Sequence, residues 1–316
     1  PDFEGTSATC WLAWGTGSLS KGTSGMCPVT MATSAYRAPA ILTSMALDDE
    51  SVVESRERQG YHRMATAEHA NLIVYRTPDY LISGVQDLRK GEYESSTHVA
   101  QVTLHNKVVL FWSCPHTMGE GSGLRPDYWS GHTTLPRVIQ HQNVMSLTWR
   151  LSDIAWMTHC FFEQNKFDEV RLDVAAQGTG TWAFARVGKG YVGIWSQNGY
   201  VVGERGQYAG RELQCYADEN TWLVECGREA DYGSFDAFCQ ALSGARIDVA
   251  DGAVTYESPS AGTFVTGWDA TPTIQGQPIA LRDYPMIDSD WAYSEYDSGR
   301  LALCRGDETH TIYLNQ

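Results

Sequence analysis

The chain has 316 residues, of which 42% are hydrophobic, 11% aromatic and 19% charged; this composition supplies one large core or two smaller ones and excludes a mainly disordered chain. No run of about 18 apolar residues occurs, and no basic segment followed by an apolar one opens the sequence, so we expect neither a membrane-spanning helix nor a signal peptide within it. The formal charge of −15 repels phosphate backbones and anionic membranes, so neither nucleic acid nor a membrane is an expected partner.

Residues 1–64 are predicted to form an irregular and helical linker. The sequence begins at Pro1 and its first thirty residues are rich in Gly, Thr and Ser, which suggests a piece of a longer protein. Apolar residues at helical spacing between residues 30 and 48 predict two short helices, with a break at Pro39. Residues 48–63 alternate in charge sign and are expected to form a solvated connector or an edge strand.

Residues 65–316 are predicted to form an antiparallel β-sandwich. Short segments rich in β-branched and aromatic residues, separated by turns, are typical of this mainly β fold class. The predicted strands are Asn71–Arg76, His98–Leu104, Val108–Ser113, Val144–Leu151, Thr181–Val187, Tyr191–Ser196 and Thr221–Cys226. Most of the aromatic residues are expected to pack in the core, although stacked aromatic rings also bind sugars.

Two local elements have specific signals. Asp251-Gly252 lies between two alternating runs, 247–250 and 253–256, and predicts a type I′ hairpin because both central positions need positive φ. Ser234 is the expected N-cap of a short helix that Gly244 ends.

The cysteines allow two interpretations. None of the eight forms a C-x-x-C pair, which excludes a zinc ribbon or a thioredoxin-type motif. Cys10 and Cys27 flank a polar loop, and Cys215, Cys226 and Cys239 cluster, so one to three disulfides in an exported protein are expected, with buried free thiols as the alternative.

The segment from Arg76 to His141 holds most of the chemically capable side chains. A strand starting at His98 would place this imidazole on the apolar face, as a core residue or as a ligand or base at the mouth of a cleft. The long polar loop from Ser113 to Trp129 is a typical place for a binding site. Neither phosphate-binding glycine motif occurs, so no nucleotide cofactor is expected, and the absence of G-x-S-x-G gives no support to an α/β-type serine hydrolase.

Three runs in the sequence resemble the C-terminal half of large microbial proteins similar to the heparinase II/III-like polysaccharide lyases. These runs are residues 75–87, residues 125–138 and residues 190–199. The resemblance covers the chain from about Ala35 onward. It implies an N-terminal helical toroid followed by an antiparallel β-sandwich, and the toroid is not part of this sequence.

The resemblance also implies a divalent metal, zinc or another, near the cleft. In the family, a histidine opens one strand of the sandwich and an aspartate ends the next; here His98 matches the first, and Cys114 stands where the aspartate is expected, with His116 two residues later. His98, Cys114 and His116 are therefore the expected ligands, and zinc accepts such donors. The additional candidates for a third ligand are Asp127, His132 and His141.

Lyase chemistry assigns roles to the same segment. Elimination across the C4–C5 bond of a uronic acid requires neutralisation of the carboxylate, a base for the C5 proton and an acid for the leaving oxygen. The expected catalytic residues are His98 or His116 as base, Tyr128 as acid with Tyr80 as the alternative, and Arg125 as a carboxylate clamp. The expected substrate-binding residues are Arg76, Tyr80, Trp129 and Arg137.

The expected function is β-elimination on an acidic glycan, in a secreted or periplasmic protein, with a partner chain or a missing N-terminal domain supplying the toroid. A glycoside hydrolase is one alternative, because Glu92, Glu94, Glu120 and Asp127 offer paired carboxylates. A β-sandwich that binds glycan, or docks on a partner, without catalysis is the other.

Overall fold

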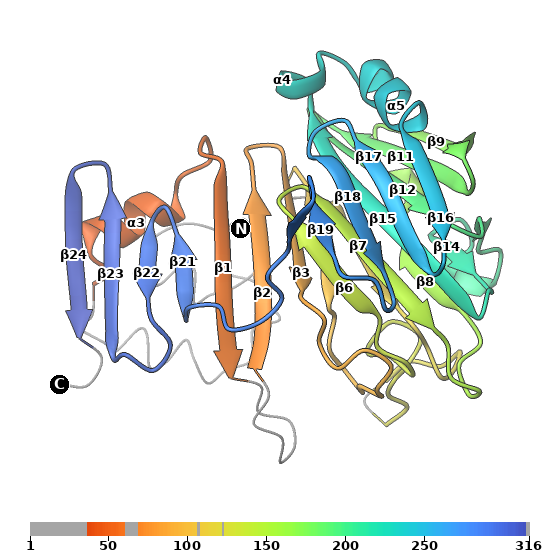
Figure 1. Ribbon diagram of the computed structural model, residues 1–316, viewed down its shortest axis with the longest axis horizontal. Coiled ribbons are helices and arrows are strands. Elements are labelled where there is room, and N and C mark those ends of the chain that lie inside the picture. Colours follow the sequence, from red (N-terminus) through yellow and green to blue (C-terminus); the bar gives the residue numbers. More distant parts are fainter. Residues whose placement is uncertain (1–36, 61–68, 106–107, 122, 314–316) are drawn as a thin grey trace.

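The computed structural model describes residues 37–60, 69–105, 108–121 and 123–313. They form three sheets stacked in layers, antiparallel apart from one short parallel pair in the third sheet, with a flat extension at one side (Figure 1). The predicted mainly β, antiparallel sandwich is therefore confirmed.

The largest sheet has twelve strands, in the order β13-β14-β8-β5-β4-β3-β2-β1-β21-β22-β23-β24. Its first half belongs to the sandwich and its second half forms the extension (Figure 1). The bounds are β1 Val53–Gly60, β2 His69–Arg76, β3 Tyr80–Val85, β4 Ala100–Leu104, β5 Val108–Ser113, β8 Thr158–Phe161, β13 Val201–Val202, β14 Glu212–Cys215, β21 Ile287–Ser289, β22 Ala292–Ser294, β23 Arg300–Arg305 and β24 Glu308–Tyr313.

The central sheet has six strands in the order β6-β7-β15-β12-β11-β9. Both of its faces are covered, so its inner strands β7, β12 and β15 are buried on both sides instead of alternating, while the edge strand β9 is partly exposed. The bounds are β6 Arg137–His141, β7 Val144–Arg150, β9 Glu169–Ala175, β11 Thr181–Val187, β12 Gly190–Ser196 and β15 Glu219–Arg228.

The third sheet, in the order β10-β16-β17-β18-β19-β20, packs on the other face of the central sheet together with α5. Its bounds are β10 Gln177–Gly178, β16 Arg246–Ala250, β17 Ala253–Ser258, β18 Gly262–Gly267, β19 Thr273–Ile274 and β20 Gln277–Pro278. The helical segments are α3 Ala40–Ala46, α4 Glu229–Tyr232, α5 Phe235–Ser243 and the 3-10 turns η1 Gln164–Lys166 and η2 Gly206–Tyr208.

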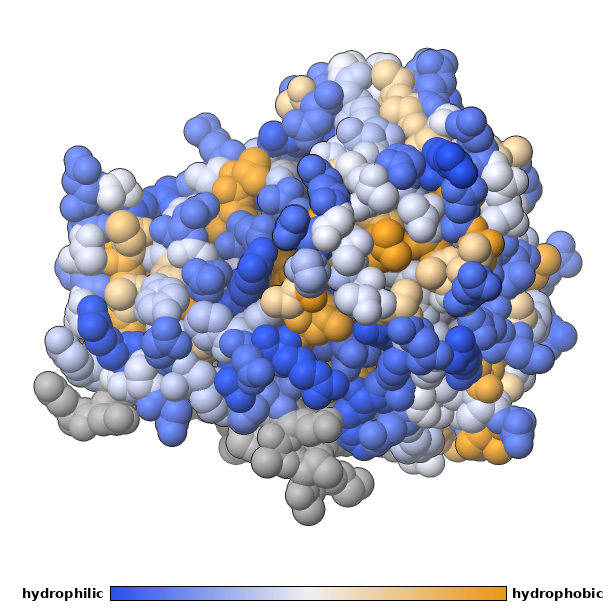
Figure 2. Space-filling model, viewed as in Figure 1, coloured by the Kyte–Doolittle hydropathy of each residue, from blue (hydrophilic) through white to orange (hydrophobic). Residues whose placement is uncertain are grey.

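Two large hydrophobic clusters hold the layers together. The first lies between β3, β4, β5, β8 and β14 of the large sheet and the central sheet, and the second lies between the central sheet and the third sheet with α5. Five tryptophans are fully buried, namely Trp112, Trp149, Trp182, Trp195 and Trp222. Much of the aromatic content therefore stabilises the core, as expected. On the molecular face drawn in Figure 2, hydrophobic residues are interspersed among hydrophilic ones.

The two specific local predictions are confirmed. The chain reverses at Asp251 and Gly252, which have φ of 52° and 74°, and Ala250 pairs with Ala253. The Ser234 Oγ atom accepts a hydrogen bond of 3.1 Å from the Ala237 backbone N–H at the start of α5.

The N-terminal third departs from the predictions in two places. Val53–Gly60, expected as a solvated connector or an edge strand, is a strand, but it lies in the middle of the large sheet, paired with β2 on one side and β21 on the other. Only one helix, α3, is described in residues 37–48; it starts after Pro39 and packs Ile41 and Met45 against Leu303 of β23. The predicted helix before Pro39 lies largely outside the described residues.

Six of the cysteines lie in the described residues and all six are free thiols. The clustered cysteines Cys215, Cys226 and Cys239 are buried, so the alternative interpretation holds for them and the disulfide prediction is wrong there. Cys10 and Cys27 lie outside the described residues. In the part of the chain that the structure describes, no helix has the length and apolarity needed to cross a membrane.

Candidate functional site

The polar loop after β5 is folded around one carboxylate. The Asp127 Oδ1 atom accepts hydrogen bonds from the backbone N–H groups of Trp129 and Ser130, at 2.9 and 2.7 Å, and Oδ2 accepts one from Gly121 at 3.0 Å. Asp127 is buried. The loop therefore holds Tyr128 and Trp129 in place without regular secondary structure.

Three strands of the large sheet place polar side chains under this loop. On β5, Leu110 and Trp112 point into the core, so period two directs Phe111 and Ser113 to the outer face. Ser113 pairs in register with His159 of β8, and His159 with Gln214 of β14. The outer face of β5, β8 and β14 is thus the floor beneath the loop.

A chain of short hydrogen bonds crosses this floor. The Ser113 hydroxyl lies 2.6 Å from His159 Nε2, and His159 Nδ1 lies 2.6 Å from a carboxylate oxygen of Glu212. The Tyr128 hydroxyl donates to the same carboxylate at 2.8 Å, and Gln214 Nε2 donates to Tyr128 and to Glu212. Burial, reinforced by the adjacent Glu212, raises the pKa of Tyr128 and keeps its hydroxyl protonated.

Ser113, His159 and Glu212 have the connectivity of a serine–histidine–acid triad. All three are fully buried, and the Trp129 indole stacks on the His159 ring with 4.3 Å between ring centroids. The network is closed to a substrate in this arrangement. Its effect here is to fix Tyr128 and Trp129 on the outer face of the sheet.

An outer-face aromatic cluster adjoins this network; its members are His98, Phe111, Trp129, Phe161 and Tyr208. Ring centroids are 4.6 Å apart for His98 and Phe111, 5.2 Å for Phe111 and Phe161, and 5.0 Å for Trp129 and Phe161. The four rings other than His98 are half-buried, while His98 is exposed. Such a surface offers apolar ring faces and edges to a ligand on the rim of a sheet.

His98 does not occupy the predicted position. β4 begins at Ala100, two residues later than expected, so period two does not apply to His98 and its ring lies against Phe111 instead of in the core. Surrounding protein atoms lower the pKa of His98 by desolvation; the charge of Arg125 acts in the same direction, and that of Asp127 opposes it. The imidazole is therefore mainly neutral at pH 7 and able to accept a proton.

Of the predicted catalytic and substrate-binding residues, five gather around this loop and cluster. His98 and Trp129 belong to the outer-face aromatic cluster, and Tyr128 stacks on Tyr208 with centroids 5.2 Å apart. Arg125 is exposed, and its backbone carbonyl accepts a hydrogen bond from Tyr93. His116 is also exposed; its backbone N–H donates to the carbonyl of Pro126, but its ring has no hydrogen bond with a described residue.

The structure places the other three elsewhere. Arg76 binds Asp48 at 3.1 Å and lies over the ring of Trp291, in the extension. Tyr80 is buried in the core between the large sheet and the central sheet.

Arg137 is buried between sheets. Its guanidinium contacts Asp87 at 3.2 Å and donates to the carbonyls of Gly267, Trp268 and Ala270. These contacts join β6 to the third sheet, which is a structural use of an arginine.

The predicted metal ligands do not form one group. Cys114 is buried against the core, and burial raises its thiol pKa to about 12, whereas His98 and His116 are exposed. Within the described ranges, no group of three or more His, Cys, Asp or Glu side chains is arranged to hold a metal ion. Cys114 is thus poorly suited to share a metal with the two histidines, and the metal stays a prediction from the resemblance.

Among the described residues, the remaining candidates for metal binding or hydrolysis do not form one group, although the backbone of His132 pairs with those of Glu94 and Cys114. Desolvation lowers the pKa of the buried His132 to about 3, and burial also lowers that of His141. Among the acids of the glycosidase alternative, Glu94 is buried, whereas Glu92 and Glu120 are exposed, with Glu92 paired to Arg89. Asp127 is committed to the loop backbone.

Sequence reasoning missed Ser113 as a network member, and with it His159, Glu212 and Gln214. Along the chain, Ser113, His159 and Glu212 are 46 or more residues apart, and only Glu212 and Gln214 are close neighbours. No sequence motif connects them. The signal present in the sequence is a polar residue at an outward position of an otherwise apolar strand. Which strands pair, and therefore which of these residues meet, depends on the tertiary fold.

Comparison with protein-family profiles, with curated proteins and with solved structures gives no match.

Proposed function

We propose that this chain is the sandwich part of a polysaccharide lyase that acts on an acidic, uronate-containing glycan, with the cleft completed by a helical toroid. The observation that carries the proposal is an exposed histidine, His98, with a lowered pKa, at the edge of the outer-face aromatic cluster and within electrostatic range of Arg125. The resemblance of residues 75–87, 125–138 and 190–199 to heparinase II/III-like lyases supports the same conclusion.

The chemistry uses these groups in separate roles. Arg125 binds the uronate carboxylate, which makes the C5 proton more acidic, and the neutral His98 takes that proton. The C4–O bond then breaks while the C4–C5 double bond forms, and the glycosidic oxygen leaves with a proton. The aromatic rings hold the sugar.

The proton donor is the part that this surface lacks. Tyr128 keeps its proton, but its hydroxyl is buried and donates to Glu212. We therefore assign the donor to the toroid rather than to Tyr128, and we expect the chain alone to bind glycan with little turnover.

A non-catalytic glycan-binding role is the second candidate, because the outer-face aromatic cluster serves binding without any base. Absorbance near 235 nm separates the two, since only elimination creates an unsaturated sugar. A glycosidase would release reducing ends without this absorbance.

The test first measures the binding of uronate oligosaccharides to this chain by the change in its tryptophan fluorescence. It then measures the rate of turnover of the same oligosaccharides by the full-length native protein. Arg125→Gln should weaken binding about tenfold, because it removes a charge-assisted contact. His98→Ala should leave binding within a few-fold and abolish turnover. His310→Ala, an exposed histidine on β24, is the control and should change neither. Full turnover in His98→Ala would contradict the proposal.

A further inference from the structure

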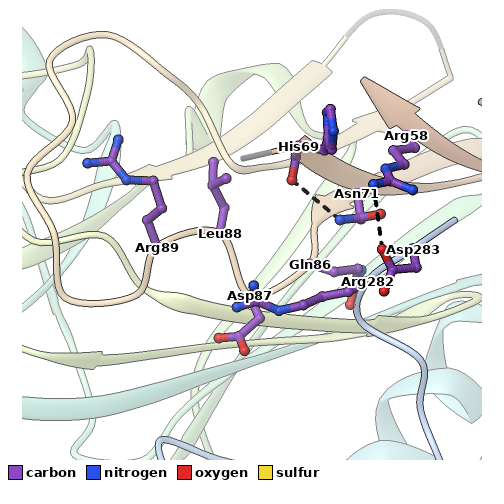
Figure 3. A pocket seen from close by; sticks show the side chains of 9 residues that line it. All are labelled: Arg58, His69, Asn71, Gln86, Asp87, Leu88, Arg89, Arg282 and Asp283. Atoms are coloured by element: carbon purple, nitrogen blue, oxygen red, sulfur yellow. Dashed lines mark hydrogen bonds and ion pairs between the residues drawn. The ribbon is translucent and has the colours of Figure 1, made fainter. Parts of the chain in front are cut away.

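A pocket that does not involve the outer-face aromatic cluster lies next to the loop after β3, where three segments of the chain meet. Arg58 and His69 come from β1 and β2, Gln86 and Arg89 from the loop after β3, and Arg282 from the segment that leads to β21 (Figure 3). The hollow opens to solvent, and the space that a ligand could fill in it is about 170 Å³. This volume is smaller than a site for a drug-sized molecule and suits a small ligand or a single functional group.

The lining is positively charged in a chain with a strong negative charge. Three arginines and two aspartates, Asp87 and Asp283, line the pocket, and one of the arginines, Arg89, is paired with Glu92. Asp87 is already paired with Arg137 at 3.2 Å. Asp283 is largely exposed, and its ion pair with Arg58 is long, at 3.5 Å. The guanidinium of Arg282 has no hydrogen bond or ion pair with another described residue, so it is available to a ligand.

Gln86 supplies a donor that has no acceptor. The residue is only 2% exposed, and its Oε1 atom accepts the backbone N–H of Gln140 at 3.0 Å. Because only the amide oxygen can accept the Gln140 N–H, this oxygen must face Gln140, and the Nε2 group takes the opposite position in the amide. Among the residues that the structure describes, no group accepts from this Nε2. A buried donor without a partner is costly, and a ligand oxygen would satisfy it.

Two further side chains are held in position around the hollow. The Tyr296 hydroxyl lies 3.2 Å from His69 Nδ1, and the guanidinium of Arg58 lies over the Tyr296 ring at 4.4 Å. Figure 3 shows Arg58 beside Asn71 and Asp283 at one end of the pocket, with Gln86 next to them, while the Arg282 side chain extends along the pocket toward Asp87. The donors are therefore partly preorganised.

We propose that this pocket binds the oxyanion group of a small ligand, a carboxylate or a sulfate or phosphate group, through Arg282, Arg58 and the Gln86 amide. Guanidinium groups bind such oxyanions with paired hydrogen bonds, and the amide N–H completes the set. The proposal does not depend on lyase activity, because it concerns different residues from the outer-face aromatic cluster.

The test is calorimetric titration of the full chain with sodium sulfate, sodium phosphate and sodium glucuronate, at constant ionic strength set with chloride and with glucose as the neutral probe. At least one oxyanion should bind with one-site stoichiometry and glucose should not. Binding of glucuronate that Arg282→Gln weakens and Arg125→Gln does not would assign a carboxylate ligand to this pocket, and binding of sulfate or phosphate alone a tetrahedral one; either supports the proposal.

Arg282→Gln should weaken oxyanion binding about tenfold with an unchanged unfolding midpoint, because Arg282 is exposed and has no hydrogen bond or ion pair with a described residue to lose. Gln86→Glu, which replaces the amide donor by a carboxylate, should abolish binding. Arg205→Gln is the matched control at an exposed arginine outside the pocket. Absence of oxyanion binding, or equal binding in the wild type and Arg282→Gln, would overturn the proposal.

Discussion

Glu225 is a carboxylate buried between the central sheet and the third sheet. It accepts hydrogen bonds from four hydroxyl groups, those of Tyr232, Tyr256, Ser258 and Ser260, at 2.7 to 3.0 Å. Desolvation raises its pKa in spite of these hydrogen bonds. The folded protein therefore binds the Glu225 proton more tightly than the unfolded chain does.

This difference makes stability depend on pH with a defined sign. The contribution of Glu225 is fully present below the unfolded pKa of about 4.3 and is lost as pH rises through the folded pKa. Glu225→Gln should remove this loss, so the variant gains stability relative to the wild type as pH rises. Urea unfolding at several pH values measures the slope. Glu257→Gln, on an exposed position of β17, should keep the wild-type slope; the same slope in Glu225→Gln would contradict the assignment.

Tyr128 is the donor that connects the loop after β5 to the floor of the candidate site. Tyr128→Phe keeps the ring stacked on Tyr208 but removes a hydrogen bond to the buried Glu212 carboxylate. We expect a loss of about 1–3 kcal/mol in the free energy of unfolding. Tyr313→Phe, which is 60% exposed, should change it by less than about 0.5 kcal/mol. Equal values for the two variants would show that the network does not stabilise the loop.

At the scale of elements, the N-cap of α5 is the most isolated contribution. Ser234→Ala should cost about 1 kcal/mol, because the Ala237 backbone N–H loses its acceptor. Ser243→Ala at the other end of the same helix should be neutral or slightly stabilising, because alanine has the higher helix propensity. Thermal unfolding of both variants checks this, and a larger loss in Ser243→Ala would contradict the capping role.

Elements with a local cause were predictable from sequence, and those with a tertiary cause were not. The hairpin at Asp251-Gly252 and the start of α5 follow from turn and cap chemistry within a few residues. The strand Val53–Gly60 has alternating charges and looks like a connector or an edge strand. Its backbone nevertheless pairs on one side with β2, the next strand in the chain, and on the other side with β21 near the C-terminal end. Partner strands far along the chain overrode its local pattern.

The residues of the candidate site also divide into those that local sequence predicts and those whose position depends on the tertiary fold. The loop from Ser113 to Trp129 was predictable as a long polar loop that follows a strand, and Arg125, Tyr128 and Trp129 lie on it; its role as a site stays a prediction. Arg76 and Arg137 have the right chemistry for carboxylate binding, but the fold pairs them with Asp48 and Asp87. Composition cannot distinguish an arginine that faces a ligand from one that joins two sheets.

At the scale of the whole molecule, the central sheet is covered on both faces, so ligands have access to the outer layers and rims. The outer-face aromatic cluster and the oxyanion pocket both involve the large sheet, but they are built from different strands. Each of the two proposed binding functions can therefore be tested by its own variants without repacking the two main cores.

The most direct measurement on the central claim is mass spectrometry of the oligosaccharides that the full-length native protein releases from a uronate-containing polysaccharide. Elimination predicts products with an unsaturated terminal uronate, lighter by one water than hydrolysis products, and their loss in His98→Ala. Saturated products only, or unsaturated products that persist in His98→Ala, would contradict the account.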